Sequence, residues 1–251
     1  MGVIEIKNLK LSAGGRVILD GFSLEVCPGE VHVLAGKNGA GKSSLAKAMA
    51  GCPGYEILGG DITMDGTSIV GRQPDEIARM GIFLAFQNPV AIPGVSVANF
   101  IRAALQAKMV KGSPFNAVDF YKNLQAKMEI LDIDKNFSAR SINDEFSGGE
   151  KKRCEILQML MLEPKYAILD EIDSGLDIDA TKIVAVAVNG MRGPNFAAIV
   201  VTHHSKLLEY VRPDFVHVIG DGKIVASGGV ELMNKLEKVG YGFFGAAGEG
   251  E

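Results

Sequence analysis

The sequence predicts an α/β fold with parallel strands at the centre of its sheet. Strand-like apolar runs alternate with helix-like patterns along much of the chain, which is typical of this fold class. A glycine-rich loop also joins one predicted strand directly to one predicted helix. The chain has 251 residues, of which 47% are apolar, so it can form one large domain or a domain that carries an inserted lobe.

The predicted strands are short apolar or alternating runs, such as "VHVLA" and "AAIVV". They lie at 3–9, 22–26, 31–35, 61–64, 82–86, 166–170, 197–201 and 214–219. The predicted helices lie between many of these strands, at roughly 42–50, 97–108, 117–132, 149–162, 178–190 and 230–237.

The middle of the chain interrupts this alternation, because the stretch from about 90 to 162 is almost purely helical. We therefore expect a single domain over 1–251, with a helical subdomain inserted into its core at about 90–162. The chain ends in "GAAGEGE", and we expect residues 246–251 to form a disordered tail.

Charge and hydropathy exclude several classes of function. The 26 basic and 30 acidic residues give a net charge of −4, and both signs are spread along the chain. This balance gives no electrostatic basis for binding nucleic acid or an anionic membrane. The best apolar runs are only as long as a strand, so any membrane-spanning part would belong to another polypeptide.

The N-terminus and the cysteines indicate the compartment. The chain begins at once with alternating apolar residues and shows no secretory signal. Cys27, Cys52 and Cys154 lie far apart and lack metal-ligand spacing, which is typical of reduced thiols. We expect a cytoplasmic protein, or one of the plastid stroma if a transit peptide has been removed.

The loop "GKNGAGKS" at 36–43 matches the phosphate-binding pattern G-x-x-x-x-G-K-[ST]. A strand precedes it and a helix follows it, which disfavours the alternative of a chance glycine-rich turn. Its glycines let the backbone surround the β-phosphate, Lys42 neutralises β- and γ-oxygens, and Ser43 offers a hydroxyl to Mg²⁺. The predicted nucleotide-binding residues here are Gly36, Asn38, Gly39, Ala40, Gly41, Lys42, Ser43 and Ser44.

The run "YAILDE" at 166–171 is a buried strand that ends in two carboxylates. Asp170 is expected to help hold Mg²⁺ through water, and Glu171 to polarise the attacking water. A solvated turn is the alternative. The phosphate loop earlier in the chain favours the functional interpretation.

Two further polar residues follow predicted strands. Gln87 can contact Mg²⁺ or the attacking water, and His203 can contact the γ-phosphate, although either alone would be an ordinary exposed residue. The predicted catalytic residues are Glu171, His203 and Gln87, and the predicted metal ligands are Ser43, Gln87 and Asp170.

The stretch "FSGGEKKR" at 146–153 predicts a second phosphate-binding position. Ser147, Gly148 and Gly149 open a helix, where free backbone N–H groups lie at the positive end of the helix dipole. Two incomplete half-sites on one chain predict a two-fold dimer.

The order of these motifs along the chain resembles the ATP-binding cassette (ABC) ATPases, whose fold is a P-loop NTPase core. This resemblance implies a mixed sheet with an inserted helical subdomain, ATP and Mg²⁺ as ligands, and ATP hydrolysis. It also implies an ATP-dependent dimer of cassettes, in which the SGG helix end caps the γ-phosphate bound by a second cassette facing it head-to-tail.

Several stretches resemble one branch, the SufC family, which supplies the ATPase of the SUF iron–sulfur cluster assembly system. They are "FSGGEKKR" in place of the usual LSGGQ, Ile172-Asp173 after Glu171, "FQNPVAIPGVS", "ILQMLMLEP" and "GYGFF". The resemblance implies SufB- and SufD-type scaffold proteins as partners, with "NPVAIPGVSVANFI" (88–101) as the expected contact surface. The cytosolic subunit of an ABC membrane transporter is the alternative. A translation or chromosome-maintenance ATPase is disfavoured, since neither a second cassette nor a long coiled coil is present.

Two departures from the common pattern lead to further expectations. No aromatic residue lies in 11–17 to stack on adenine, so Val17 or the face of Arg16 is expected there, and tolerance of GTP stays open. The acids that follow Asp170 also need cations nearby. We therefore expect a lysine from 151–152 to pair with an acid from 171–173 in the isolated subunit, which would hold Glu171 away from its working position.

Overall fold

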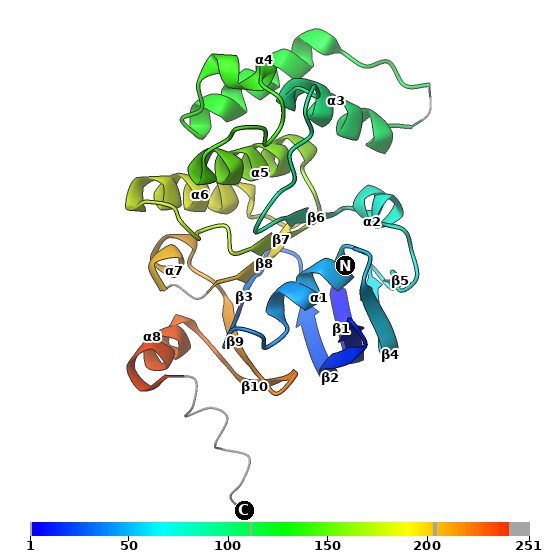
Figure 1. Ribbon diagram of the computed structural model, residues 1–251, viewed down its shortest axis with the longest axis vertical. Coiled ribbons are helices and arrows are strands. Elements are labelled where there is room, and N and C mark those ends of the chain that lie inside the picture. Colours follow the sequence, from blue (N-terminus) through cyan, green and yellow to red (C-terminus); the bar gives the residue numbers. More distant parts are fainter. Residues whose placement is uncertain (1, 111, 203–204, 241–251) are drawn as a thin grey trace, which may run out of the picture.

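The computed structural model describes residues 2–110, 112–202 and 205–240, and in this part of the chain the strands form two sheets (Figure 1). The smaller sheet is antiparallel in the order β2-β1-β4-β5. Its strands are β1 (Ile4–Ala13), β2 (Arg16–Val26), β4 (Tyr55–Met64) and β5 (Thr67–Ser68).

The larger sheet has the order β10-β9-β3-β8-β7-β6. Its strands are β3 (Val31–Gly36), β6 (Ile82–Ala85), β7 (Tyr166–Asp170), β8 (Ala197–Val201), β9 (Phe215–Gly220) and β10 (Lys223–Gly228). Only the pair β9–β10 is antiparallel, and the other neighbours run parallel. This confirms the predicted α/β fold with a mixed sheet.

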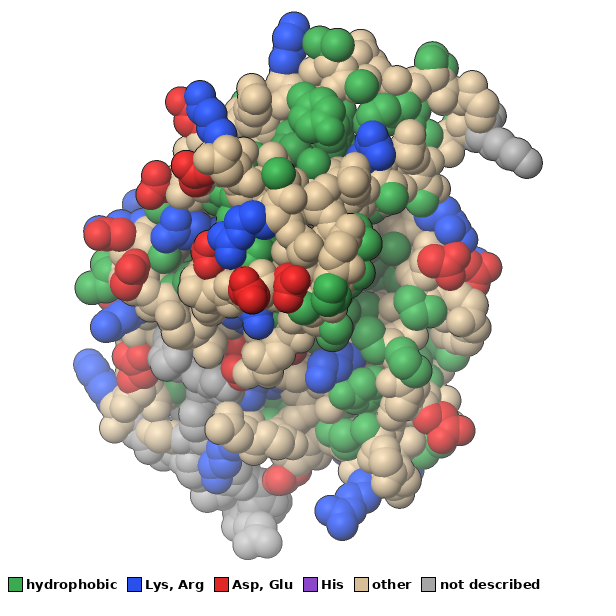
Figure 2. Space-filling model, turned by 45° about the horizontal axis from the view of Figure 1, so that its top comes forward, with side chains coloured by type: hydrophobic (Ala, Val, Ile, Leu, Met, Phe, Trp, Pro, Cys, Tyr) green, Lys and Arg blue, Asp and Glu red, His purple; other side chains and the backbone are tan. Residues whose placement is uncertain are grey.

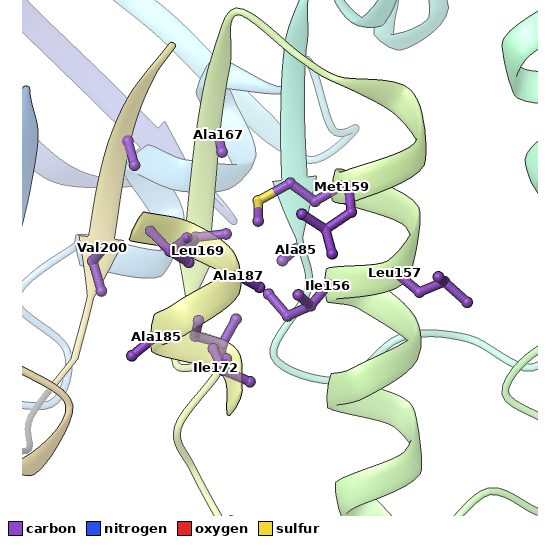
Figure 3. Packing of buried hydrophobic residues seen from close by; sticks show 14 of the residues in the cluster. Ala85, Ile156, Leu157, Met159, Ala167, Leu169, Ile172, Ala185, Ala187 and Val200 are labelled. Atoms are coloured by element: carbon purple, nitrogen blue, oxygen red, sulfur yellow. The ribbon is translucent and has the colours of Figure 1, made fainter. Parts of the chain in front are cut away.

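Alternating side chains of the larger sheet pack into two cores, because successive residues of a strand point to opposite faces. On β8, Ala198 and Val200 belong to the core under the helices, while Ile199 and Val201 face the antiparallel sheet. Figure 3 shows the first core, where α5 (Gly148–Leu162) and α6 (Ile178–Met191) cover the sheet. In the second core, α1 (Lys42–Met49) packs between the two sheets.

The other helices pack on α5 and α6 or lie beside the outer strands of the larger sheet. The helices α3 (Val97–Lys108) and α4 (Ala117–Ile130) and the short 3-10 helix η1 (Lys135–Ala139) lie between β6 and α5 in the chain and form the upper part of Figure 1. The rest are α2 (Pro74–Met80), α7 (Ser205–Val211) and α8 (Val230–Val239). None of the described helices is both long and apolar enough to cross a membrane.

The six predicted helices are confirmed as α1, α3, α4, α5, α6 and α8, but several elements were missed or shortened. The strands β2 and β4 begin at Arg16 and Tyr55, well before the predicted 22 and 61. The edge strand β10 was missed because its residues alternate between exposed and half-buried, which leaves no apolar run to detect. Asp221 and Gly222 join it to β9 with positive φ angles of 46° and 76°, as a two-residue hairpin requires. The predicted tail at 246–251 lies outside the described residues.

Candidate nucleotide-binding site

The predicted site residues meet because the strands that carry them are parallel neighbours. Gly36 ends β3 and Asp170 ends β7, while β8 lies between those two strands and β6 lies beside β7. The carboxyl ends of parallel strands share one edge of a sheet, where open α/β folds bind their ligands. The phosphate loop, the two acids and Gln87 therefore emerge at the same edge.

The phosphate loop needs glycine for steric reasons. Gly39 and Gly41 have φ angles of 83° and 99°, in the region that other residues rarely adopt. A Cβ atom on Gly41 would also lie 2.7 Å from Cδ2 of Leu19. Gly41 is the N-cap of α1, so the loop delivers its backbone N–H groups to the start of that helix.

Lys42 is buried beneath this loop. Its Nζ donates hydrogen bonds to the carbonyl oxygens of Gly36 at 2.8 Å and Lys37 at 3.0 Å. Burial lowers the pKa of Lys42, and the negative charges of Glu171 and Asp170 oppose that shift. The hydrogen bonds of the ammonium group thus go to two loop carbonyls, and phosphate oxygens can replace them.

Ser43 and Asp170 contact each other across the site. The Ser43 hydroxyl donates to Oδ1 of Asp170 at 2.9 Å, and Asp170 is only 1% exposed. Burial raises the pKa of Asp170, while the Ser43 hydrogen bond opposes the rise. Burying this carboxylate is unfavourable unless a cation or donors compensate.

Glu171 begins a sharp turn directly after β7. Its φ angle is 49°, and its backbone N–H donates to the carbonyl of Val201 at 2.9 Å. Nε2 of Gln87 donates a hydrogen bond to Oε2 of Glu171. A non-glycine residue held at positive φ is often found at functional sites, and here it turns the carboxylate toward Gln87.

These side chains surround a cavity of about 490 Å³. It is lined by Ile18, Asn38, Gly39, Gly41, Lys42, Ser43, Ser44, Gln87, Glu171, Asp173 and Ser174. Most of the predicted nucleotide-binding and catalytic residues are thereby brought together. Ile18 was not predicted, because it comes from β2, a strand whose link to the loop exists only in the folded chain.

The second predicted phosphate position begins α5. Ser147 is the N-cap: its hydroxyl accepts from the N–H of Glu150 at 3.2 Å, and Oε2 of Glu150 accepts from the N–H of Ser147 at 2.8 Å. Glu150 also forms an ion pair with Arg140. Ser147 and Gly148 are exposed, and a Cβ atom on Gly148 would meet nothing within 4 Å. Residues 147–149 do not line the cavity that the described residues form.

Comparison with known proteins assigns the family. A family model described as "ABC transporter" matches residues 19–174, which is more than half of the chain.

The chain belongs to the ABC transporter family.

The protein is therefore an ABC-type ATPase. It is 50% identical over 241 residues to a probable ABC transporter ATP-binding protein of Streptococcus pyogenes serotype M18, covering 96% of this chain and 94% of the relative. It is also 50% identical over 243 residues to a probable ATP-dependent transporter of a Synechocystis strain, covering 96% and 95%. A solved dimeric ATP-binding cassette, bound to ADP and phosphate after hydrolysis, has the same fold with a TM-score of 0.78 at 18% identity, covering 90% and 98%.

The expected pairing of a lysine from 151–152 with an acid from 171–173 is found only in part: the charges of Asp173 and Glu171 act on Lys152 and oppose the lowering of its pKa by burial. Among the described residues, no ion pair joins Lys151 or Lys152 to that segment. Nζ of Lys152 instead donates to the carbonyl of Gln87 at 2.7 Å. The cation beside Glu150 is Arg140, because the loop before α5 folds back onto that helix.

The structure bears differently on three other predictions. His203 lies outside the described residues. Val17 is 50% exposed and Arg16 is exposed, so both stay accessible beside the cavity. In the expected partner segment, Val97 and Ile101 are fully buried and pack the helical part of the cassette, whereas Val90 is 81% exposed.

Proposed function

We propose that the cassette hydrolyses ATP at a head-to-tail interface, where each cavity is completed by α5 of a second copy. The observation that carries this proposal is the exposed start of α5. Ser147 and Gly148 offer a helix N-terminus to solvent, away from the cavity of their own chain. Because a Cβ atom on Gly148 would meet none of the described residues within 4 Å, the space there is open to a ligand held by another copy.

Within one cavity, the loop and Lys42 bind the phosphates of ATP. The N–H groups around Gly39 and Gly41 cradle the β-phosphate. Lys42 exchanges its bonds to the carbonyls of Gly36 and Lys37 for β- and γ-oxygens, which adds no new burial since the ammonium is already desolvated.

The residues beside the loop suit Mg²⁺. Ser43 and Asp170 supply hard oxygen atoms of the kind that this ion prefers, and the buried Asp170 carboxylate calls for a cation. Ser43 would bind the ion directly, Asp170 through water, and Gln87 would be a further oxygen donor. When bound with ATP, Mg²⁺ would neutralise charge on the β- and γ-phosphates.

Glu171 and Gln87 act on the attacking water. Glu171 orients the water and accepts its proton as the water attacks the γ-phosphorus, so that ADP and phosphate are released. Gln87 holds the Glu171 carboxylate by the hydrogen bond described above. His203 is proposed to contact the γ-phosphate, and it lies outside the described residues.

We further propose that ATP hydrolysis drives a conformational change in an iron–sulfur cluster scaffold of the SufB/SufD type, in the cytoplasm or the plastid stroma. This is supported by the SufC-like stretches, above all "FSGGEKKR" and Ile172-Asp173 after the catalytic glutamate. Membership of the ABC family is compatible with this partner, because the family assignment concerns the cassette and not the protein on which it acts.

A groove beside Gln87 offers a surface for the scaffold. It has a volume of about 410 Å³ and is lined mainly by apolar residues of α2, β6, α3 and 88–92. Figure 2 shows hydrophobic side chains gathered along a hollow on the right-hand side of the molecule, between the helical part and the strands. Phe86 and Ile92 are each 39% exposed at this groove, as expected of a surface that a partner covers.

The alternative function is that of the ATP-binding subunit of a membrane transporter. The names of the relatives favour it, since two of them are called a probable ABC transporter ATP-binding protein and a probable ATP-dependent transporter. The same cavity and groove would serve either function, so only the partner distinguishes them.

A mixing experiment tests the composite site. Lys42→Ala disables one half-site and Gly148→Asp the other, so each variant alone should be inactive. In a 1:1 mixture half of the dimers are mixed, and each has one intact site of two, which predicts about a quarter of wild-type hydrolysis. A mixture as inactive as the single variants would contradict the head-to-tail site.

Affinity purification from a native extract tests the partner. Co-purification of scaffold polypeptides without membrane-spanning segments would support the SUF function. An integral membrane subunit would establish the transporter function instead. Val90→Glu, in the exposed wall of the groove, should weaken capture of either partner, whereas Val118→Glu on the distant helix α4 is the matched control.

A further inference from the structure

Two buried side chains of α5 hold the backbone on either side of Phe86 and Gln87, at the N–H of Phe86 and the carbonyl of Gln87. Oε2 of Glu155 accepts a hydrogen bond from the N–H of Phe86 at 3.0 Å, and Nζ of Lys152 donates to the carbonyl of Gln87 at 2.7 Å. Lys152 and Glu155 are 5% and 4% exposed. They are three residues apart, so they project from the same face of the helix.

Packing does not explain why a carboxylate is buried at position 155. Burial raises the pKa of Glu155 to about 7, and the Phe86 N–H, the Gln158 amide and the charge of Lys152 oppose that rise. Nε2 of Gln158 donates to Oε1 of Glu155 at 3.1 Å, so both carboxylate oxygens have a donor. An apolar residue would avoid the desolvation but would leave the N–H of Phe86 without its acceptor.

The backbone segment of Phe86 and Gln87 lies between two different cavities. Phe86, Glu155 and Gln158 line the apolar groove beside α2 and α3, while Gln87 and Glu171 line the nucleotide cavity. The same helix, α5, begins with Ser147. A fixed contact here therefore connects the groove, the start of α5 and the nucleotide cavity through a single backbone segment.

We propose that Glu155 is a positioning residue, which together with Lys152 clamps the Phe86–Gln87 backbone to α5 so that the Gln87 side chain holds Glu171 in the nucleotide cavity. Neither residue of this clamp touches the phosphate loop. Its effect is therefore on turnover rather than on ATP binding, given the roles of Gln87 and Glu171 proposed above.

The test compares two substitutions at one position in the full chain. Glu155→Leu removes the acceptor, whereas Glu155→Gln keeps an oxygen that can accept from the Phe86 N–H. We expect kcat for ATP hydrolysis to fall ~10-fold in Glu155→Leu, with KM within about two-fold of wild type, because one buried donor loses its partner. Glu155→Gln should recover most of kcat. Amide hydrogen exchange across 82–90 should accelerate in the leucine variant and stay near wild type in the glutamine variant.

Leu157→Ala is the matched control for general damage to α5. Leu157 is fully buried, and Figure 3 shows that it points from α5 away from the sheet. It should lower the unfolding temperature yet keep kcat within about two-fold at a temperature where the chain is folded. If Glu155→Leu does not fold, Lys152→Met removes the other half of the clamp and should lower kcat in the same way.

The outcomes separate this inference from the proposed function. Wild-type kcat and wild-type amide exchange in a folded Glu155→Leu would overturn the clamp, and so would a glutamine variant as slow as the leucine one with its amides still protected. Gln87→Ala and Glu171→Gln are measured in parallel. If those two keep full turnover, the roles proposed for Gln87 and Glu171 are wrong, while amide exchange still decides whether Glu155 holds the backbone.

Discussion

The two half-sites of this cassette differ in how far a single chain completes them. The phosphate loop lies in a cavity whose main polar groups contact each other: Lys42 contacts the loop carbonyls, and Ser43 contacts Asp170. The start of α5 has its own capping box, yet Ser147 and Gly148 face solvent. One region is thus a preformed cavity, and the other is a capped helix end that faces solvent. This difference is the basis for proposing that one chain binds ATP and that two chains are needed to hydrolyse it.

The largest expected effect is at the phosphate loop. Lys42→Ala should weaken ATP binding ~10-fold or more and reduce hydrolysis ~100-fold or more, because it removes the charge that stabilises the transferred phosphoryl group. Binding can be measured with a fluorescent ATP analogue and hydrolysis by phosphate release. Unchanged binding would show that the cavity is not the principal nucleotide site.

The second effect separates the two half-sites. Gly148→Asp should abolish hydrolysis, through repulsion of the γ-phosphate held by the facing copy, yet leave ATP affinity of the isolated chain within about two-fold of wild type. Gly148→Ala is the control, since its Cβ meets nothing within 4 Å and the fold should be unaffected. A parallel loss of binding in the aspartate variant would place both half-sites in one chain and break the comparison.

A third effect concerns β3, the strand that carries the loop, and its neighbour β9. His217 stacks beside His32 with Nε2 3.0 Å from Nδ1 of His32, and the Nδ1 of His217 lies 2.8 Å from the Ser227 hydroxyl. Burial lowers the pKa of His217 to about 4, and the neighbouring His32 lowers it further. The unfolded chain therefore binds a proton near pH 6.5 that the folded chain does not.

The sign of this effect follows from the proton count. The contribution of His217 to stability is fully present above pH 6.5 and is lost as the pH falls toward 4, at up to about 1.4 kcal/mol per pH unit. In urea unfolding, the free energy of unfolding of wild type should fall relative to that of His217→Gln as the pH is lowered over that range. A difference that is independent of pH would mean that folding does not lower the pKa of His217.

The smallest effect is the pH dependence of stability that comes from Glu155 on α5. Its sign is opposite to that of the His217 effect. Because the pKa of Glu155 is raised to about 7, the folded chain keeps a proton that the unfolded chain releases above about 4.5. Wild type should therefore lose stability relative to Glu155→Gln as the pH rises from 4.5 to 7. The same urea measurements, made with both variants, would compare the two sides of the cassette directly. If the difference in stability between wild type and Glu155→Gln does not change with pH, Glu155 is ionised in the folded chain over that range.

Much of the site could be predicted because its signals are local. The loop at 36–43 requires glycine at positive φ beside a lysine, and a strand that ends in Asp170-Glu171 shows its character within six residues. The cap of α5 is equally local, since Ser147 and Glu150 are three residues apart. Parallel strands then bring such ends to one edge of the sheet whatever the details of packing.

The contacts that were missed join residues far apart in the chain. Arg140 pairs with Glu150, and Lys152 donates its hydrogen bond to the carbonyl of Gln87 rather than to an acid of 171–173. The sequence shows which charges need partners but not which partner comes within hydrogen-bond distance, because that depends on how α5 packs against the strand end at Phe86.

The sequence by itself determined the fold class, the phosphate loop, the strand-end acids and the exposed start of α5, since each is written in neighbouring residues and in backbone angles that few residues allow. Only the tertiary structure decided which charges pair, that Ile18 joins the cavity wall, and that Glu155 and Lys152 hold the Phe86–Gln87 backbone. The physical reason is distance: a hydrogen bond or an ion pair depends on a few ångströms of packing between segments, and neither composition nor periodicity specifies that separation.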